Sequence, residues 1–196
     1  KRHTNLINKL AKKKFFLFLH YTEPHKHLVD EVIQKYKNKN DDKYYKSIKE
    51  NNTRYESYLP ALDRYVSAIL NTLKDLSLFN KTIIIFHADH GTSVGEKMGE
   101  KFYGVFVYDY TINVFSVIKI PNVPPKHIDY QCRTIDLYPT IVDLVGMDLK
   151  QLDKKMQGKT LSPFLSEKEK NDREVFVETG GLYGPWSSPE KHNVFC

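Results

Sequence analysis

A short apolar run that ends on a cluster of ionisable side chains constrains this chain more than any other feature. Residues 81–91 read KTIIIFHADHG, so the run is followed directly by His87, Asp89 and His90. Runs of β-branched and aromatic residues of this length are typical of a strand buried within a sheet. We therefore expect a strand over residues 82–86 whose carboxyl end carries groups that can bind a metal or transfer a proton.

A second apolar run is also followed directly by a cluster of ionisable side chains. Residues 15–19 (FFLFL) predict another strand that is buried on both faces, and a cluster that includes His20, Glu23, His25 and His27 follows it. In an open α/β sheet, ligands bind at the carboxyl ends of the strands. If the two strands are parallel neighbours, both polar clusters meet at one edge of the sheet. That edge is the expected functional site.

The rest of the chain alternates helix and strand patterns. Apolar residues recur at spacings of three and four between positions 62 and 76, which predicts an amphipathic helix over residues 60–77. The other segments expected to be regular are a helix over residues 133–147 and strands over residues 114–120 and 173–179. This alternation predicts an α/β fold with a mainly parallel sheet.

Composition narrows the class of protein. A chain of 196 residues, 40% hydrophobic and 28% charged, has the size of one domain with a sizeable core. The net charge of +6 comes from lysines scattered among asparagine and glutamate, without a stripe of arginine and aromatic residues, so no nucleic-acid partner is expected. No apolar run approaches the ~18 residues of a membrane helix. Cys132 and Cys196 form no CxxC pair, which argues against a zinc framework.

The two strand ends carry side chains suited to a metal-dependent site. Asp89 supplies an anionic oxygen and His90 an imidazole nitrogen, and both can turn towards one ion. His25 can bind an anion or act as a general acid. Lys97 and Lys101 can each bind a sulfate or phosphate oxygen as a point charge. The alternative for each histidine and lysine is a solvated loop side chain, and Asp-His-Gly is also common in ordinary turns.

Six segments occur in the order found in sulfatases of the alkaline phosphatase superfamily, and the chain resembles that family over about residues 15–180. They are FLFLHYTEPHKH, the amphipathic helix, KTIIIFHADHGTSVGEK, FVYDYTINVFSVIKIP, RTIDLYPTIVDLVGM and GKTLSPFL. The resemblance implies an alkaline-phosphatase-like three-layer sandwich that is present as a single partial domain over residues 1–196. A polar insertion at about residues 30–53 interrupts the match.

The resemblance also implies roles for individual residues. Asp89 and His90 match two ligands of a divalent metal, for which calcium is the expected ion and zinc or manganese the alternatives. His25 matches the histidine that contacts the sulfate or the leaving oxygen. The family has a lysine or histidine shortly before the segment matched by Tyr108, and Lys101 is the lysine nearest to that place. The substrate implied is an anionic sulfate or phosphate ester.

Other matched residues are expected to be structural, namely Asp109 next to Tyr108 and both Asp136 and Pro139 in the second helix. The family's nucleophile and its aspartate pair precede the first matched strand, and no such motif occurs before residue 15. We expect them outside these residues. The chain by itself is then expected to be inactive and to bind metal weakly, because hard cations such as calcium take ~6–8 oxygen ligands.

Two alternatives to a sulfate ester hydrolase remain open. The first is a phosphodiesterase, a phosphonate hydrolase or a phosphoglycerol-type transferase of the same superfamily, and a plain serine or threonine nucleophile would favour it. The second is a sulfatase-like binding module without catalysis, which the absence of a basic residue directly before Tyr108 would favour.

Overall fold

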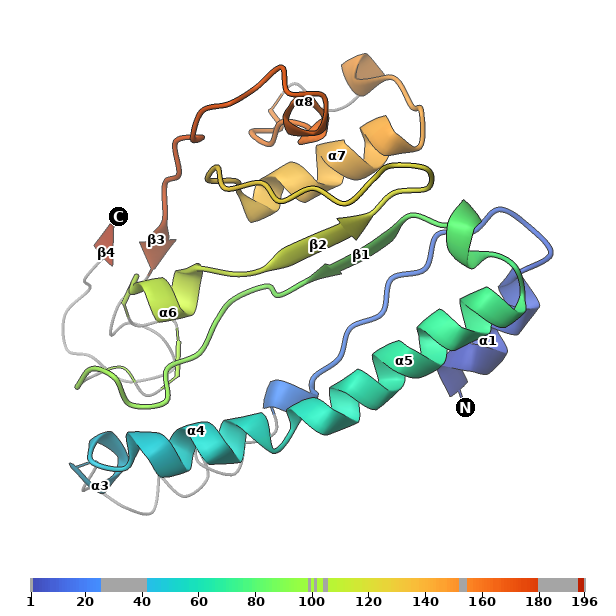
Figure 1. The fold of residues 1–196 in the computed structure, drawn as a ribbon. Coiled ribbons are helices and arrows are strands. Elements are labelled where there is room, and N and C mark those ends of the chain that lie inside the picture. The colour runs from blue at the N-terminus through green and yellow to red at the C-terminus, as the bar shows by residue number, and fades with distance from the viewer. Residues whose placement is uncertain are drawn as a thin grey trace. The chain divides into compact units, whose positions relative to one another are not determined.

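The computed structural model describes residues 2–25, 42–98, 100, 102–103, 106–151, 155–179 and 194–195. The chain divides into two compact units (Figure 1). Unit 1 is Lys1–Val123 with Thr179–Val194, and unit 2 is Pro124–Glu178 with Phe195–Cys196.

Unit 1 consists mainly of helices around a pair of strands. Its α-helices are α1 (Arg2–Leu10), α3 (Asp42–Tyr45), α4 (Ile48–Glu56), α5 (Leu59–Asp75) and α6 (Asp109–Ile112). The 3-10 helices are η1 (Glu23–His25) and η2 (Phe79–Lys81), and the strands are β1 (Ile84–His87) and β2 (Ser116–Lys119). Unit 2 contains η3 (Thr134–Asp136), α7 (Leu137–Leu144), η4 (Leu149–Gln151) and α8 (Ser162–Leu165). The short strands β3 (Glu178–Thr179) and β4 (Val194–Phe195) form a second sheet.

Helix α5 confirms the amphipathic helix expected over residues 60–77. It has Pro60 in its first turn, where the missing backbone N–H of proline is no loss. Its apolar face supplies Leu73 to a buried cluster completed by Ile7 of α1 and Ile84 of β1. This cluster is the core of unit 1, and it anchors β1 against the two helices. Among the described helices, none is long and apolar enough to cross a membrane.

The two strands of unit 1 pair in antiparallel fashion. The strands expected over residues 82–86 and 114–120 are confirmed as β1 and β2, and their register places Ile84 opposite Lys119 and His87 opposite Ser116. The α/β class is confirmed, but the pair is not parallel as the alternation predicted. Parallel neighbours need a crossover connection, usually a helix. In the described part of the connection, only α6 is helical, and the chain turns back along β1.

The expectation of a strand buried on both faces at residues 15–19 is wrong. The segment is extended and runs in the same direction as β1 in Figure 1, yet it joins no ladder with any described strand. Leu17 packs against the core of unit 1, whereas Phe16 and Phe18 are 74% and 70% exposed. The apolar run therefore buries one face only. The strand expected over residues 173–179 is likewise reduced to β3.

The helix expected over residues 133–147 is present in unit 2 as η3 followed by α7. It ends before Gly146, whose φ of 77° is the left-handed conformation that glycine adopts without steric cost. Asp136 at the start and Pro139 in the first turn are both buried. The segment GKTLSPFL adds α8 beside α7, with Phe164 in the core of this unit.

Candidate functional site

The carboxyl end of β1 is held in place by the backbone of the segment around α6. Ala88 N–H donates to the Phe115 carbonyl at 3.3 Å, and Gly91 N–H donates to the Thr111 carbonyl at 2.8 Å. A Cβ atom on Gly91 would lie 2.1 Å from the Tyr110 carbonyl oxygen, so only glycine allows the two backbones to approach this closely. These backbone contacts at Ala88 and Gly91 hold the turn that carries Asp89 at both of its ends.

Asp89 and His90 are oriented towards one another by local hydrogen bonds. Asp89 Oδ1 accepts the His90 backbone N–H at 3.0 Å. His90 Nδ1 lies 2.7 Å from the Gly91 carbonyl oxygen, and because a carbonyl can only accept, Nδ1 carries the proton. In the neutral ring the lone pair is then on Nε2, which faces Asp89 Oδ2 at 3.8 Å. Such an outer hydrogen bond on the second ring nitrogen is typical of metal-binding histidines.

These two side chains fit part of a metal site. Zinc bonds to nitrogen and oxygen measure about 2.0–2.2 Å, and calcium–oxygen bonds about 2.3–2.6 Å. A separation of 3.8 Å between His90 Nε2 and Asp89 Oδ2 is therefore within the span of two bonds to one ion. The Asp89 side chain is 69% exposed, which leaves its carboxylate accessible to a cation. The described residues contain no group of three or more histidine, cysteine or acidic side chains that could hold a metal.

Tyr103 contacts one residue from each of the two polar clusters that follow the apolar runs. Its ring lies 3.8 Å from the His90 ring and 6.0 Å from the His25 ring, measured between centroids. Tyr103 thus lies beside one residue from each polar cluster, although the parallel strand pairing on which the prediction of their meeting depended is absent among the described strands. Burial raises the pKa of the Tyr103 hydroxyl, and the nearby Asp89 carboxylate raises it further. The hydroxyl therefore keeps its proton at neutral pH and can donate a hydrogen bond.

Tyr103 is a site residue that the sequence alone does not identify. The only available signal was its position shortly before Tyr108, where the resemblance called for a basic side chain. Lys101 was the alternative for that place, and it lies outside the described residues, as does His27. Lys97 Nζ lies 4.3 Å above the ring of Tyr108, so this lysine is engaged in a cation–π contact.

The remaining predicted histidines lie beside the cluster rather than within it. His87 is exposed at the end of β1, and its Nδ1 donates to the Ala88 carbonyl at 2.9 Å. His20 is also exposed, and it lines a separate cavity with Tyr21 and Tyr65. The structure thus brings His25, Asp89 and His90 to one place and leaves His20 and His87 outside it.

A second feature of the site is a cavity of about 270 Å³ beside His90. Thr92 and Tyr110 line it: the Thr92 hydroxyl is buried without a hydrogen-bond partner among the described residues, and the Tyr110 hydroxyl, also buried, lies close to the Ser93 side chain. Burial raises the pKa of Tyr110 to about 12, with further contributions from Glu100 and Glu96. Both hydroxyls are therefore protonated donors next to the candidate metal ligands.

A family model described as Sulfatase matches residues 1–147. Arylsulfatase K of Homo sapiens is 29% identical over 148 residues, which cover 75% of this chain and 26% of that protein. Endo-4-O-sulfatase of Bacteroides thetaiotaomicron is 27% identical over 131 residues, which cover 66% of this chain and 25% of that protein. The chain therefore spans about a quarter of the length of these relatives.

Solved structures agree with the sequence matches. Phosphonate monoester hydrolase of Agrobacterium radiobacter is 25% identical with a TM-score of 0.56, and the likeness covers 64% of this chain and 25% of that one. Ps i-CgsB in complex with k-i-k-neocarrahexaose has a TM-score of 0.65 at 22% identity, covering 90% of this chain and 39% of that one. The second likeness concerns the fold only. The expected alkaline-phosphatase-like fold, present as a partial domain, is confirmed.

Proposed function

Since the chain belongs to the sulfatase family, we propose that it forms the metal-binding part of a hydrolase that acts on sulfate esters. The observation that carries the proposal is the orientation of His90 Nε2 towards Asp89 Oδ2, next to His25 and Tyr103. In this proposal Asp89 and His90 hold a divalent cation. Calcium is the proposed ion, because the carboxylate is a hard oxygen ligand, and zinc or manganese would also accept the imidazole.

Each side chain of the cluster has a role in ester hydrolysis. A bound cation neutralises charge on the ester and on the group that attacks it. His25 donates a proton to the leaving oxygen, since its ring lies 6.0 Å from that of Tyr103, which also contacts the ring of His90. Tyr103 and Tyr110 donate hydrogen bonds to the peripheral oxygens of the ester, where charge develops during the reaction. Lys101 supplies a positive charge to the same oxygens.

Phosphoryl chemistry is the second candidate. The phosphonate monoester hydrolases of Silicibacter pomeroyi and Agrobacterium radiobacter are 27% and 25% identical to this chain, with TM-scores of 0.51 and 0.56. A phosphonate ester carries the same kind of anionic, tetrahedral centre as a sulfate ester, so the same cluster suits it. The curated relatives above are sulfatases by name, which favours the first candidate.

The first test measures whether the 196-residue chain binds a metal ion. Mn²⁺ is added to the chain, and binding is monitored through the line broadening of its NMR signals. We expect weak binding that selectively broadens the signals of His25, His90 and Tyr103. Asp89→Asn and His90→Ala should each weaken binding by at least about tenfold, which is the lower range for loss of a metal-supporting group. Binding that is unchanged in both variants would refute the metal site.

The chain offers a matched control for these variants. His127 and Asp129 form an exposed pair in unit 2 with Nε2 and Oδ1 3.0 Å apart. His127→Ala and Asp129→Asn remove the same chemical groups from outside the cluster and should leave Mn²⁺ binding unchanged. The second test is turnover of an aryl sulfate and the corresponding aryl phosphonate by the complete natural polypeptide. Faster turnover of the phosphonate would favour the second candidate.

A further inference from the structure

The end of the polar insertion contacts the segment that follows the candidate metal ligands. Helix α3 and the start of α4 occupy residues 42–51, which fall within the insertion expected at about residues 30–53. Two side chains of these helices, Tyr44 and Asn51, bind backbone carbonyls that lie 49 and 43 positions further along the chain. This part of the insertion is therefore attached to the candidate site by specific hydrogen bonds.

Asn51 is the buried residue of α4. A side-chain amide has two N–H donors, and burying them without partners costs free energy. Asn51 Nδ2 uses both donors, one to the Tyr44 carbonyl and one to the Val94 carbonyl, each at 2.8 Å. One side chain thus joins α3, α4 and the segment after the candidate metal ligands.

Tyr44 makes a second set of contacts with the same segment. Burial raises the pKa of the Tyr44 hydroxyl well above its usual range, and the nearby Glu96 carboxylate raises it further, so the hydroxyl keeps its proton. It donates to the Ser93 carbonyl at 3.2 Å. The Tyr44 ring also meets the Phe102 ring at 70°, with centroids 5.9 Å apart. Ser93 N–H in turn donates to the Phe102 carbonyl at 2.6 Å.

These contacts determine where Tyr103 lies. Tyr103 follows Phe102 directly, and a trans peptide bond fixes the distance between their Cα atoms at about 3.8 Å. Ser93 is completely buried, and its Oγ also donates to the Glu100 carbonyl at 3.1 Å. The Tyr103 ring lies 3.8 Å from the His90 ring, measured between centroids. Because close-packed interiors transmit displacements to their neighbours, a shift of Ser93 moves Tyr103 relative to His90.

We propose that Asn51 and Tyr44 are positioning residues for Tyr103. They hold residues 93–103 in the place that keeps the Tyr103 ring against His90. The inference rests on the proposed function in one respect, since Tyr103 acts on an ester only if the site hydrolyses one. The two candidate metal ligands are oriented by hydrogen bonds within their own three residues. Loss of Asn51 should therefore displace Tyr103 and leave the metal ligands in place.

The first test is an NMR measurement on the metal-free 196-residue chain with ¹³C-labelled histidine. An aromatic ring 3.8 Å away shifts the His90 ring signals through its ring current, and Tyr103→Leu gives the value without that ring. Asn51→Ala should move the His90 signals towards the Tyr103→Leu value. Tyr44→Phe removes only the hydroxyl and keeps the contact with Phe102, so it should cause a smaller shift in the same direction. Mn²⁺ binding should be unchanged in both variants.

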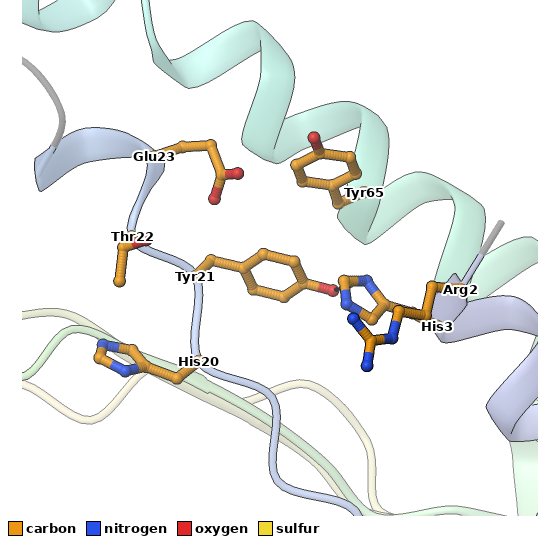
Figure 2. Close-up of a pocket in the computed structure, with 7 residues that line it drawn as sticks. All are labelled: Arg2, His3, His20, Tyr21, Thr22, Glu23 and Tyr65. Atoms are coloured by element: carbon orange, nitrogen blue, oxygen red, sulfur yellow. Dashed lines mark hydrogen bonds between the residues drawn. The ribbon is translucent and has the colours of Figure 1, made fainter.

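Two substitutions of the same kind elsewhere in unit 1 are the controls. Asn8→Ala removes an amide that donates to the Thr4 carbonyl at 3.0 Å within α1. Tyr65→Phe removes a tyrosine hydroxyl from α5, where Tyr65 lines the separate cavity shown in Figure 2. Each removes the same chemical group as one of the test substitutions from a different set of contacts. Both should leave the His90 signals unchanged.

The second test is turnover of an aryl sulfate by the complete natural polypeptide. Asn51→Ala should lower kcat by about tenfold or more and leave KM unchanged, since a small misplacement of a catalytic group is costly even when the substitution is remote. Combined with Tyr103→Phe, it should cause little further loss, because the effects of residues that act through one another do not add. A fall in stability alone would give additive losses, and additive losses would overturn the inference.

The NMR measurement can also overturn it. Wild-type His90 signals in a folded Asn51→Ala variant would do so, and if that variant does not fold, wild-type signals in Tyr44→Phe would do so instead. This readout needs neither metal nor turnover. Its outcome is therefore separate from that of the proposed function, which fails when Asp89→Asn and His90→Ala leave Mn²⁺ binding unchanged.

Discussion

The substitution Asp136→Asn tests whether a buried ion network, rather than apolar packing, stabilises unit 2. Asp136 is fully buried. Its Oδ1 accepts hydrogen bonds from Arg133 Nη2 and from the Lys159 backbone N–H, both at 2.9 Å. Its Oδ2 accepts one from Arg173 Nη1 at 2.8 Å. Asp136 therefore connects the start of α7 to two segments that are distant in the sequence.

The expected loss follows from what the substitution leaves behind. Arg173 is 7% exposed, so in the variant its guanidinium loses a buried counter-charge, although Glu169 still accepts from it at 2.8 Å. The side-chain amide of the new asparagine also points its N–H groups at the N–H donors of Arg133, Lys159 or Arg173, which previously met a carboxylate oxygen. Removing one member of a buried ion pair destabilises a protein by about 3–5 kcal/mol. For a chain of this size, that lowers the midpoint of thermal unfolding by roughly 6–20 °C.

The loss of stability caused by Asp136→Asn should be larger at neutral pH than at acidic pH. Burial by itself raises the pKa of the Asp136 carboxyl, but the hydrogen bonds from Arg133, the Lys159 N–H and Arg173 outweigh it and hold the pKa below its usual range. The folded state thus binds this proton less readily than the unfolded state. The stabilisation is present in full above the unfolded pKa, near 3.8, and is lost as the pH falls through the lower folded value.

Urea denaturation followed by far-UV circular dichroism at pH 7 and pH 3 measures both effects. The control is Asp129→Asn, since Asp129 and His127 lie side by side with both side chains more than 80% exposed (84% and 88%). An exposed pair contributes about 0–1 kcal/mol. If Asp136→Asn destabilises the chain by no more than the control at pH 7, or equally at both pH values, the ion network does not stabilise unit 2.

Two further predictions concern the candidate site. Gly91→Ala should destabilise the chain by about 1–3 kcal/mol and weaken Mn²⁺ binding, because its Cβ would lie 2.1 Å from the Tyr110 carbonyl oxygen. Gly146→Ala is the control, since its φ of 77° makes alanine costly away from the site. Tyr110→Phe should be nearly neutral at pH 7. Its unfolding free energy should fall less steeply than that of the wild type between pH 10 and about 12, where the folded wild type keeps a proton that the unfolded chain has lost.

The helices could be predicted because their signals are local. The spacing of Val66, Ile69, Leu70 and Leu73 repeats with the period of a helix, so one face of α5 must be buried whatever lies against it. The same holds for α7, whose start and end are marked by Asp136 and Gly146. Neither inference required knowledge of the tertiary contacts.

The sheet could not be predicted in the same way, because a strand is defined by its neighbours. Residues 15–19 have the composition of a buried strand, and Leu17 does pack on the core of unit 1. Phe16 and Phe18 remain exposed, since no described strand pairs with this segment. Whether β2 pairs with β1 in parallel or antiparallel fashion depends on the path of the loop between them. The glycine and charged residues of this segment predict that it is a loop, but they do not predict its path.

The candidate site also has one part that could be predicted from the sequence and one part that could not. The geometry of Asp89 and His90 arises within three consecutive residues, from the His90 N–H bound to Asp89 Oδ1 and from His90 Nδ1 bound to the Gly91 carbonyl. A pair formed by such short-range contacts can be recognised from the sequence. The contact of Tyr103 with His25 joins residues that are far apart in the chain, and no local sequence pattern predicts it. Since Tyr103 touches both histidines, the arrangement of the site depends on the residue that sequence reasoning was least able to find.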